Sequence, residues 1–116
     1  MVFGFDFRHC ALLRRDAMLH VFWTRVGDAP EHILHSMIEL DGDWGSWTPS
    51  EPESVLLPET PWEGADLPIE PSVRGQVTAP VNQLRDPAIF EHADRTWLHY
   101  TVAGESGIAL AELRDL

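Results

Sequence analysis

The fold class is decided by the stretch Leu19-His20-Val21-Phe22-Trp23-Thr24, which combines aromatic and β-branched side chains in a short run. Side chains of these types suit the pleated surface of a β-strand. Polar residues 14–16 precede the run and Gly27-Asp28-Ala29-Pro30 follows it, so both of its ends carry turn signals. We therefore predict a strand over residues 19–24, with neighbouring strands over residues 11–13 and 33–38.

An internal repeat extends this pattern to the other end of the chain. When the sequence is shifted by 77 positions without a gap, several residues fall on identical ones. The identical pairs are Arg8 and Arg85, Ala11 and Ala88, Thr24 and Thr101, and Gly27 and Gly104. The second copy therefore predicts strands over residues 88–90, 96–102 and 108–113. The first copy adds a fourth strand within residues 47–57, where two prolines favour an edge position.

These strands predict an all-β fold, specifically a partial β-propeller of about two blades of antiparallel four-stranded sheet. We expect a single domain over residues 1–116, with blade one at about residues 7–57 and an incomplete blade two at residues 85–116. A long Pro-rich loop, residues 58–84, joins the blades and holds five of the nine prolines. Loops of this length are usually functional or disordered, and the acidic and aromatic residues of this one favour a functional loop.

The charge balance excludes several classes of partner. The chain has 116 residues, of which 8 are basic and 19 are acidic, and its net charge is −11. Nucleic acid and anionic membranes are excluded as partners, because binding them requires clustered basic residues. No stretch approaches the ~18 apolar residues of a membrane-spanning helix, and no basic segment begins a signal peptide. We therefore expect a cytoplasmic protein.

The cysteine and histidine content predicts neither a disulfide nor a metal site. Cys10 is the only cysteine, and its apolar neighbours predict a small buried hydrophobic side chain. His32 and His35 are three positions apart on a predicted strand, so they point to opposite faces and cannot easily share an ion. We expect no metal and no cofactor.

Several blocks of the chain, taken in order, resemble the C-terminal two blades of five-bladed β-propellers related to glycoside hydrolase family 43. The blocks are residues 8–11, 19–31, 62–68, 82–90 and 102–109. The resemblance covers nearly the whole chain from about Phe7. In that family the catalytic base and the carboxylate that tunes the acid lie on the early blades. The resemblance therefore implies that a single copy of this chain lacks at least one essential carboxylate.

The residues themselves supply two candidate catalytic carboxylates, because glycoside cleavage needs two carboxyl groups flanking the bond. Glu63 is the candidate proton donor, since the apolar ring of Trp62 beside it favours a protonated carboxyl. Asp86 follows Arg85, whose positive charge favours an ionised carboxylate, so Asp86 suits a ligand contact better than a proton donor. Two simpler interpretations stay open. Glu63 belongs to a solvated acidic loop, or Arg85 and Asp86 only anchor the start of a strand.

The candidate ligand-binding residues come from the two strand starts and from the Pro-rich loop. They are Arg8, His9, Trp62, Asp66, Glu70, Arg74 and Arg85. His9 and Asp86 are equivalent in the repeat, so both are expected to face the mouth of the central channel. The resemblance implies a histidine near the propeller centre, sometimes associated with a metal or an ordered water. A hydrogen-bonded structural histidine is the alternative for His9, because one histidine alone does not make a metal site.

Two blades alone leave apolar faces and an open strand edge in contact with water, which predicts a homo-oligomer. A twofold dimer is the commonest closed form. The incomplete catalytic set favours a non-catalytic module that binds a carbohydrate or acts as an interaction scaffold. The alternatives are a glycoside hydrolase or related carbohydrate-active enzyme whose site is built from several subunits, and a truncated remnant with no selected role.

Overall fold

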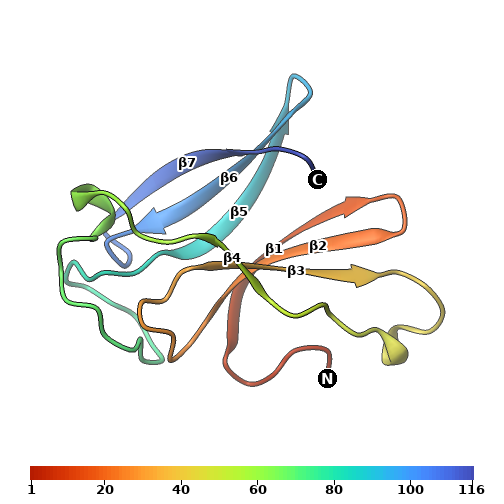
Figure 1. Cartoon of the computed structure of the whole chain (residues 1–116), viewed down its shortest axis with the longest axis horizontal. Coiled ribbons are helices and arrows are strands. Elements are labelled where there is room, and N and C mark those ends of the chain that lie inside the picture. Colours follow the sequence, from red (N-terminus) through yellow and green to blue (C-terminus); the bar gives the residue numbers. More distant parts are fainter.

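Seven strands form two antiparallel sheets in the computed structural model, which describes residues 1–116 (Figure 1). The first sheet contains β1 (Phe7–Arg15), β2 (Met18–Arg25), β3 (Ile33–Glu39) and β4 (Glu53–Leu56), and the second contains β5 (Arg85–His92), β6 (Arg95–Val102) and β7 (Gly107–Leu113). Both sheets follow the order of the chain, so neighbouring strands pair antiparallel. The other regular elements are two short 3-10 helices, η1 (Trp44–Ser46) and η2 (Pro61–Glu63), neither of which is long enough to cross a membrane.

The predicted strands are all present, and the all-β class is confirmed. β1 and β5 extend further than their apolar centres indicated, because their polar ends also pair with β2 and β6. The fourth strand of the first sheet is short and begins only after the second of the two prolines, which lack the N–H that a ladder needs. The second sheet has three strands, so β7 has a free edge, as the sequence predicted.

The repeat is also visible in the backbone. The 77-residue shift carries the ends of β2 onto the ends of β6. β1 and β5 each contain a bulge at equivalent positions, near His9 and Asp86. Both residues have a left-handed backbone, with φ of 42° at His9 and 49° at Asp86. The two sheets therefore share one backbone pattern, including the bulge and its left-handed residue.

The bulge in β1 corrects the prediction for Cys10, whose side chain is exposed rather than buried. Pairing shifts between Arg8 and Cys10, because His9 is the extra residue. A shift of one residue moves every subsequent side chain to the opposite face of a strand. Ala11 and Leu13 consequently point into the core, and Cys10 points out of it.

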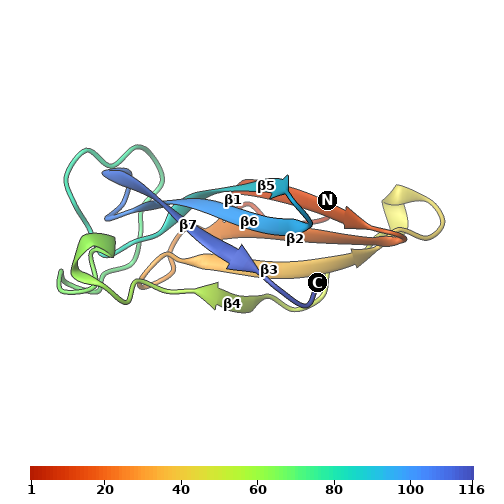
Figure 2. The same cartoon turned by 90° about the horizontal axis from the view of Figure 1, so that it is seen from above.

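The main core lies between the two sheets, which diverge from the region where β1 and β5 begin (Figure 1). It is a cluster of buried residues from both sheets and from the segment before β5. Its members are Ala11, Phe22, Ile33, Leu84, Leu98, Tyr100 and Val102. Seen from above, the sheets lie across one another; the loop with η1 lies at one end of the molecule, and the segment that connects β4 to β5 lies at the other (Figure 2). This latter end holds the strand starts that carry the candidate site.

The outer face of the first sheet is covered by the N-terminal segment. Phe3 and Phe7 stack with ring centres 4.3 Å apart, and both contact Trp23. These rings join Val21 and Leu34 in a second apolar cluster. Burying aromatic surface in this way contributes strongly to stability.

The outer face of the second sheet has no such cover. Phe90, Ile108 and Leu110 share this face, because their cross-strand partners in β6 are alternate residues. Their exposed fractions are 52%, 77% and 52%. Ile108 and Leu110 are neighbours along β7, and Phe90 lies on β5 with β6 between them. Large exposed apolar patches usually mark a contact surface.

Residues 57–84 connect β4 to β5 and pack across the turns at one end of both sheets. The Ser72 amide donates a hydrogen bond to the Asp28 carbonyl, at the turn between β2 and β3. The Val81 amide donates to the Ala103 carbonyl, at the equivalent turn between β6 and β7. Gly64 has φ of 95°, and a Cβ there would lie 2.4 Å from the Val81 carbonyl oxygen. Residues 57–84, called the lid loop from here on, are therefore held in place over the starts of β1 and β5.

Candidate functional site

A buried ion cluster holds the starts of β1 and β5 together. The Arg8 guanidinium donates two hydrogen bonds to the Glu31 carboxylate, at 2.9 and 2.5 Å. Arg85 lies 3.5 Å from the same carboxylate. Glu31 and Arg85 are fully buried. Two parallel hydrogen bonds between arginine and a carboxylate fix both groups in one orientation, so Arg8 is rigidly placed.

Arg85 donates three hydrogen bonds to partners in the lid loop, and its Nη1 atom lies 3.9 Å from Glu105 Oε2. Its Nε and Nη2 atoms donate to Gln83 Oε1 at 2.9 and 2.6 Å, and its Nη1 atom donates to the Gly75 carbonyl at 3.0 Å. Burial lowers the pKa of the Arg85 guanidinium, and the Glu31 carboxylate opposes that effect. The Arg85 guanidinium stays charged at neutral pH, because the ordinary pKa of arginine is far above neutrality. Arg85 thus ties the loop to the sheets and is not exposed to a ligand.

His9 and Asp86 meet between the starts of β1 and β5. His9 Nδ1 lies 2.8 Å from Asp86 Oδ1, and the Thr101 hydroxyl donates to Asp86 Oδ2 at 3.1 Å. Both side chains are partly exposed, by 42% and 33%. The bulges at the two residues turn these side chains toward each other, which is a common use of a bulge. The structure therefore brings together two residues that the repeat had paired only in sequence.

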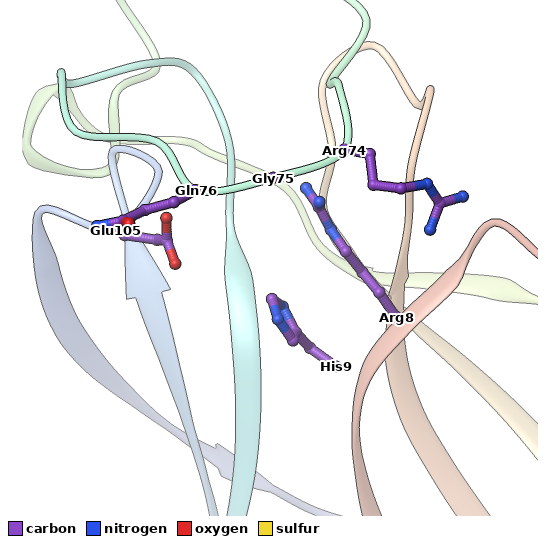
Figure 3. Close-up of a pocket in the computed structure, with 6 residues that line it drawn as sticks. All are labelled: Arg8, His9, Arg74, Gly75, Gln76 and Glu105. Carbon is purple, nitrogen blue, oxygen red and sulfur yellow. The ribbon is translucent and has the colours of Figure 1, made fainter.

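A polar cavity of about 450 Å³ opens directly beside His9, and none of its lining residues is hydrophobic. It is lined by Arg8, His9, Arg74, Gly75, Gln76 and Glu105 (Figure 3). In Figure 3 the His9 ring points into the space between Arg8 and the pair formed by Gln76 and Glu105. The Glu105 carboxylate accepts a hydrogen bond from the Val77 amide at 2.7 Å. The strand starts, the lid loop and the turn after β6 all contribute to this cavity.

Glu63 occupies a different part of the molecule. Its carboxylate is buried and accepts hydrogen bonds from the amides of Glu59 and Thr60 at 3.1 Å, and from the Thr60 hydroxyl at 3.0 Å. The Tyr100 hydroxyl donates a fourth, at 3.0 Å. Burial and then this hydrogen bond to Glu63 raise the pKa of Tyr100 to about 12. The carboxylate of Glu63 is thus fully used in fixing η2 to β6.

The two candidate catalytic carboxylates lie on opposite faces of the second sheet. Glu63 binds Tyr100, and Asp86 binds Thr101, the next residue along β6. Successive side chains of a strand point to opposite faces. Within one copy, Glu63 and Asp86 therefore do not flank a common site.

The remaining candidate residues lie away from the cavity beside His9. Trp62 is 58% exposed on η2, and Asp66 is exposed in the loop that follows. Glu70 lines a smaller cavity of about 220 Å³ formed within the lid loop. Of the predicted ligand-binding residues, the structure thus brings together Arg8, His9 and Arg74, with Arg85 behind them.

Sequence reasoning missed four side chains that build the site, namely Glu31, Gln76, Gln83 and Glu105. Glu31 gave no signal through the repeat, because the 77-residue shift aligns it with Ile108. A signal existed for Glu105, since the same shift aligns it with another acidic residue, Asp28. No group of three or more histidine, cysteine or acidic side chains in residues 1–116 is arranged to hold a metal ion.

Fold and site together define an all-β protein with a polar cavity where two repeated sheets meet. Comparison with known proteins adds one relative, an uncharacterized protein of Acanthamoeba polyphaga mimivirus that is 47% identical over 107 residues. The matched region covers 91% of this chain and 30% of the viral protein, so the chain spans about a third of the relative's length. No protein-family model matches the chain, and no solved structure matches it.

Proposed function

We propose that the chain forms two adjacent blades of a β-propeller and acts as a non-catalytic carbohydrate-binding module. The carrying observation is the polar cavity at the start of the inner strands, β1 and β5. In a propeller, the inner strands of successive blades begin at one end of a central channel, where ligands bind. The resemblance to family 43 propellers supports this assignment, and the cytoplasmic location expected from the sequence stays a prediction.

The charges around the cavity favour a ligand rich in hydroxyl groups. Glu31 neutralises Arg8, and Asp6 lies 3.3 Å from Arg74, so neither guanidinium is an isolated positive charge. Gln76 and Glu105 add further donor and acceptor atoms on the opposite side. Balanced donors and acceptors match sugar hydroxyls, which both donate and accept, whereas a phosphate requires an excess of positive charge.

The arrangement of carboxylates supports binding without catalysis. Glycoside hydrolysis requires two carboxyl groups on either side of one bond, about 5 to 10 Å apart. Glu63 and Asp86 face opposite sides of β6, and Glu63 is saturated with hydrogen bonds. A single copy therefore offers no such pair from the predicted residues.

A calorimetric titration against a panel of arabinosides, xylosides, galactosides and mannosides tests this function. We expect saturable binding of at least one saccharide to the wild-type protein. Arg74→Ala is expected to weaken it about tenfold, because it removes a cavity donor. Arg114→Ala is the matched control, since Arg114 is an exposed arginine at the C-terminal end, away from the cavity. Equal affinities for the two variants, or no binding by the wild type, would contradict the proposal.

An oligomeric glycoside hydrolase is the second candidate, favoured by two carboxylates near one cavity. Glu105 lines the cavity, and Asp86 contacts His9, which also lines it. The resemblance also implies that one copy lacks a carboxylate of the early blades, and a second copy would supply that group. Turnover of chromogenic glycosides that is abolished by Asp86→Asn would establish this function over the non-catalytic one.

We also propose that the exposed face of the second sheet is covered by a second copy of the chain, giving a homo-oligomer with a dimer as its simplest form. The repeat supports this proposal. The face of the first sheet that carries Leu13 is buried against the second sheet, and the 77-residue shift aligns Leu13 with Phe90. The equivalent face of the second sheet carries Phe90 at the position of Leu13, but no sheet packs against it.

Substitutions of two exposed isoleucines test this contact. Ile108→Asp places a charge in the proposed interface, and Ile69→Asp places the same charge on the lid loop. Both isoleucines are well exposed, by 77% and 66%. We expect Ile108→Asp to convert the oligomer into monomers in analytical ultracentrifugation, and Ile69→Asp to leave it intact. If the two variants sediment identically, this face is not the interface.

A further inference from the structure

His9 and Asp86 combine two features that suggest more than a surface ion pair. Each has a backbone φ in the left-handed region, which side chains other than glycine rarely adopt. Such conformations persist only where surrounding structure enforces them, and they are concentrated at functional sites. Here both strained residues come from equivalent positions in the repeat, and their side chains meet beside the polar cavity.

The contacts of Asp86 determine which ring nitrogen of His9 carries the proton. An ionised carboxylate can only accept hydrogen bonds, so the nitrogen that faces it, Nδ1, must be the donor. The other carboxylate oxygen accepts from the Thr101 hydroxyl, which holds Asp86 in this orientation. In the neutral ring, Nε2 is then left as an acceptor.

The surroundings leave that acceptor available to a ligand. His9 lines the cavity and is 42% exposed, and no hydrogen bond to its Nε2 is made within the chain. The charged groups that face the ring are Asp86 on β5, which contacts it, and Arg8, Arg74 and Glu105, which line the cavity with it. Arg8 is held by Glu31 and does not compete for Nε2.

We propose that His9 Nε2 is the acceptor atom of the cavity, and that Asp86 is the positioning residue that fixes its tautomer. A ligand hydroxyl donates a hydrogen bond to Nε2, while the Nδ1 proton stays on the ring and faces Asp86. The identity of that ligand as a saccharide rests on the proposed function, but the tautomer does not. This assignment gives Asp86 a role that acts through His9 rather than on the ligand.

Long-range proton–nitrogen NMR of the histidine rings tests the tautomer in the ligand-free protein. The expected result for the neutral form of the ring is a proton on Nδ1 and none on Nε2. In Asp86→Asn the side-chain amide can donate to Nδ1, so the ring proton is expected to move to Nε2. Asp16→Asn is the matched control, because Asp16 also has a left-handed backbone but lies at the far end of β1. A wild-type ring protonated at Nε2 would overturn the proposal.

Ligand binding gives the second readout. With a saccharide that binds the wild type, Asp86→Asn is expected to weaken binding about tenfold, and Thr101→Val by less, because Val only frees Asp86 to rotate. Unchanged affinity in Asp86→Asn, together with a reversed tautomer, would show that Nε2 accepts nothing from the ligand and would also overturn the proposal. If no saccharide binds the wild type, the carbohydrate function fails, and the tautomer measurement alone decides the role of Asp86.

Discussion

The two sheets are copies of one sequence pattern, yet equivalent faces of the copies have opposite environments. In the first sheet, Leu13 is 5% exposed and packs between the sheets. In the second sheet, its equivalent Phe90 is 52% exposed. The first sheet also has a fourth strand, whereas β7 ends the second sheet with a free edge. The repeat therefore encodes a sheet with apolar residues on both faces, and the exposed face of the second sheet is the one that we propose a second copy covers.

A feature that the two sheets share explains where the cavity arises. The repeat places a bulge and a left-handed residue at the start of β1 and at the start of β5. When the two sheets pack together, these irregular points become neighbours, and His9 reaches Asp86. A site therefore forms from two positions that are 77 residues apart, because a regular strand pair would have turned those side chains away from each other.

The largest effect is expected at Glu31, whose equivalent in the second copy is the exposed Ile108. Glu31→Ala removes the carboxylate between Arg8 and Arg85 and leaves two guanidinium groups close together without their counter-charge. Breaking a buried pair in this way costs about 3–5 kcal/mol. Urea unfolding measures the loss of stability. Glu91→Ala, which removes an exposed partner of Arg15, should change it by about 1 kcal/mol or less.

A second, slightly smaller effect tests the two faces directly. Leu13→Ala creates a cavity in the core and is expected to cost about 2–5 kcal/mol. Phe90→Ala at the equivalent position should change the stability of the isolated chain by only about 0.5 kcal/mol. Both values are read from urea unfolding at low protein concentration. Similar losses for the two variants would mean that the exposed face is already covered within one chain.

Tyr100 and its repeat equivalent Trp23 differ in titration, which gives a third test. Because the pKa of Tyr100 is raised to about 12, its contribution to stability is complete below pH 10 and is lost as the pH rises through 12. Tyr100→Phe should remove that alkaline loss, at a cost of about 1 kcal/mol near neutral pH for the missing hydrogen bond to Glu63. Thermal melts across pH 8 to about 12 measure both effects. A wild-type slope that persists in the variant would count against this interpretation.

The smallest effect is expected from a histidine pair that only the first sheet contains. His20 Nδ1 lies 2.9 Å from His35 Nε2, and burial lowers the pKa of both rings. Since the folded-state values lie below the ordinary 6.5, the stability they contribute is present above pH 6.5 and is lost as the pH falls below it. His20→Gln should flatten the acid limb of a stability profile. His92→Gln, on the exposed end of β5, should leave that limb unchanged.

Much of the fold could be predicted from the sequence, because strands and turns depend on local residue patterns. The run from Leu19 to Thr24 and its repeat specified the sheets without any distant contact. Cys10 was predicted wrongly, because a single bulge residue, His9, reverses the facing of the side chains that come after it in β1. The position of that bulge depends on the partner strand, which a local pattern does not contain.

The site was less predictable, because its decisive contacts join residues that are far apart in the chain. The repeat marked His9 and Asp86 as equivalent positions, but it did not predict that their side chains contact each other. Similarly, the burial of Glu63 depends on Tyr100, and the anchoring of Arg8 depends on Glu31, and neither pair is marked by spacing. Trp62 beside Glu63 suggested a carboxyl kept protonated by an apolar ring, but Trp62 is exposed whereas Glu63 is buried.

The mass of the assembled wild-type protein tests most directly whether the second sheet needs a neighbour. Size-exclusion chromatography with light scattering at micromolar concentration measures it without any substitution. Our account predicts a whole multiple of the 13.1 kDa chain, with twice that mass as the simplest result. A stable species of 13.1 kDa at that concentration would contradict the account, because Phe90, Ile108 and Leu110 would then face water in the finished protein.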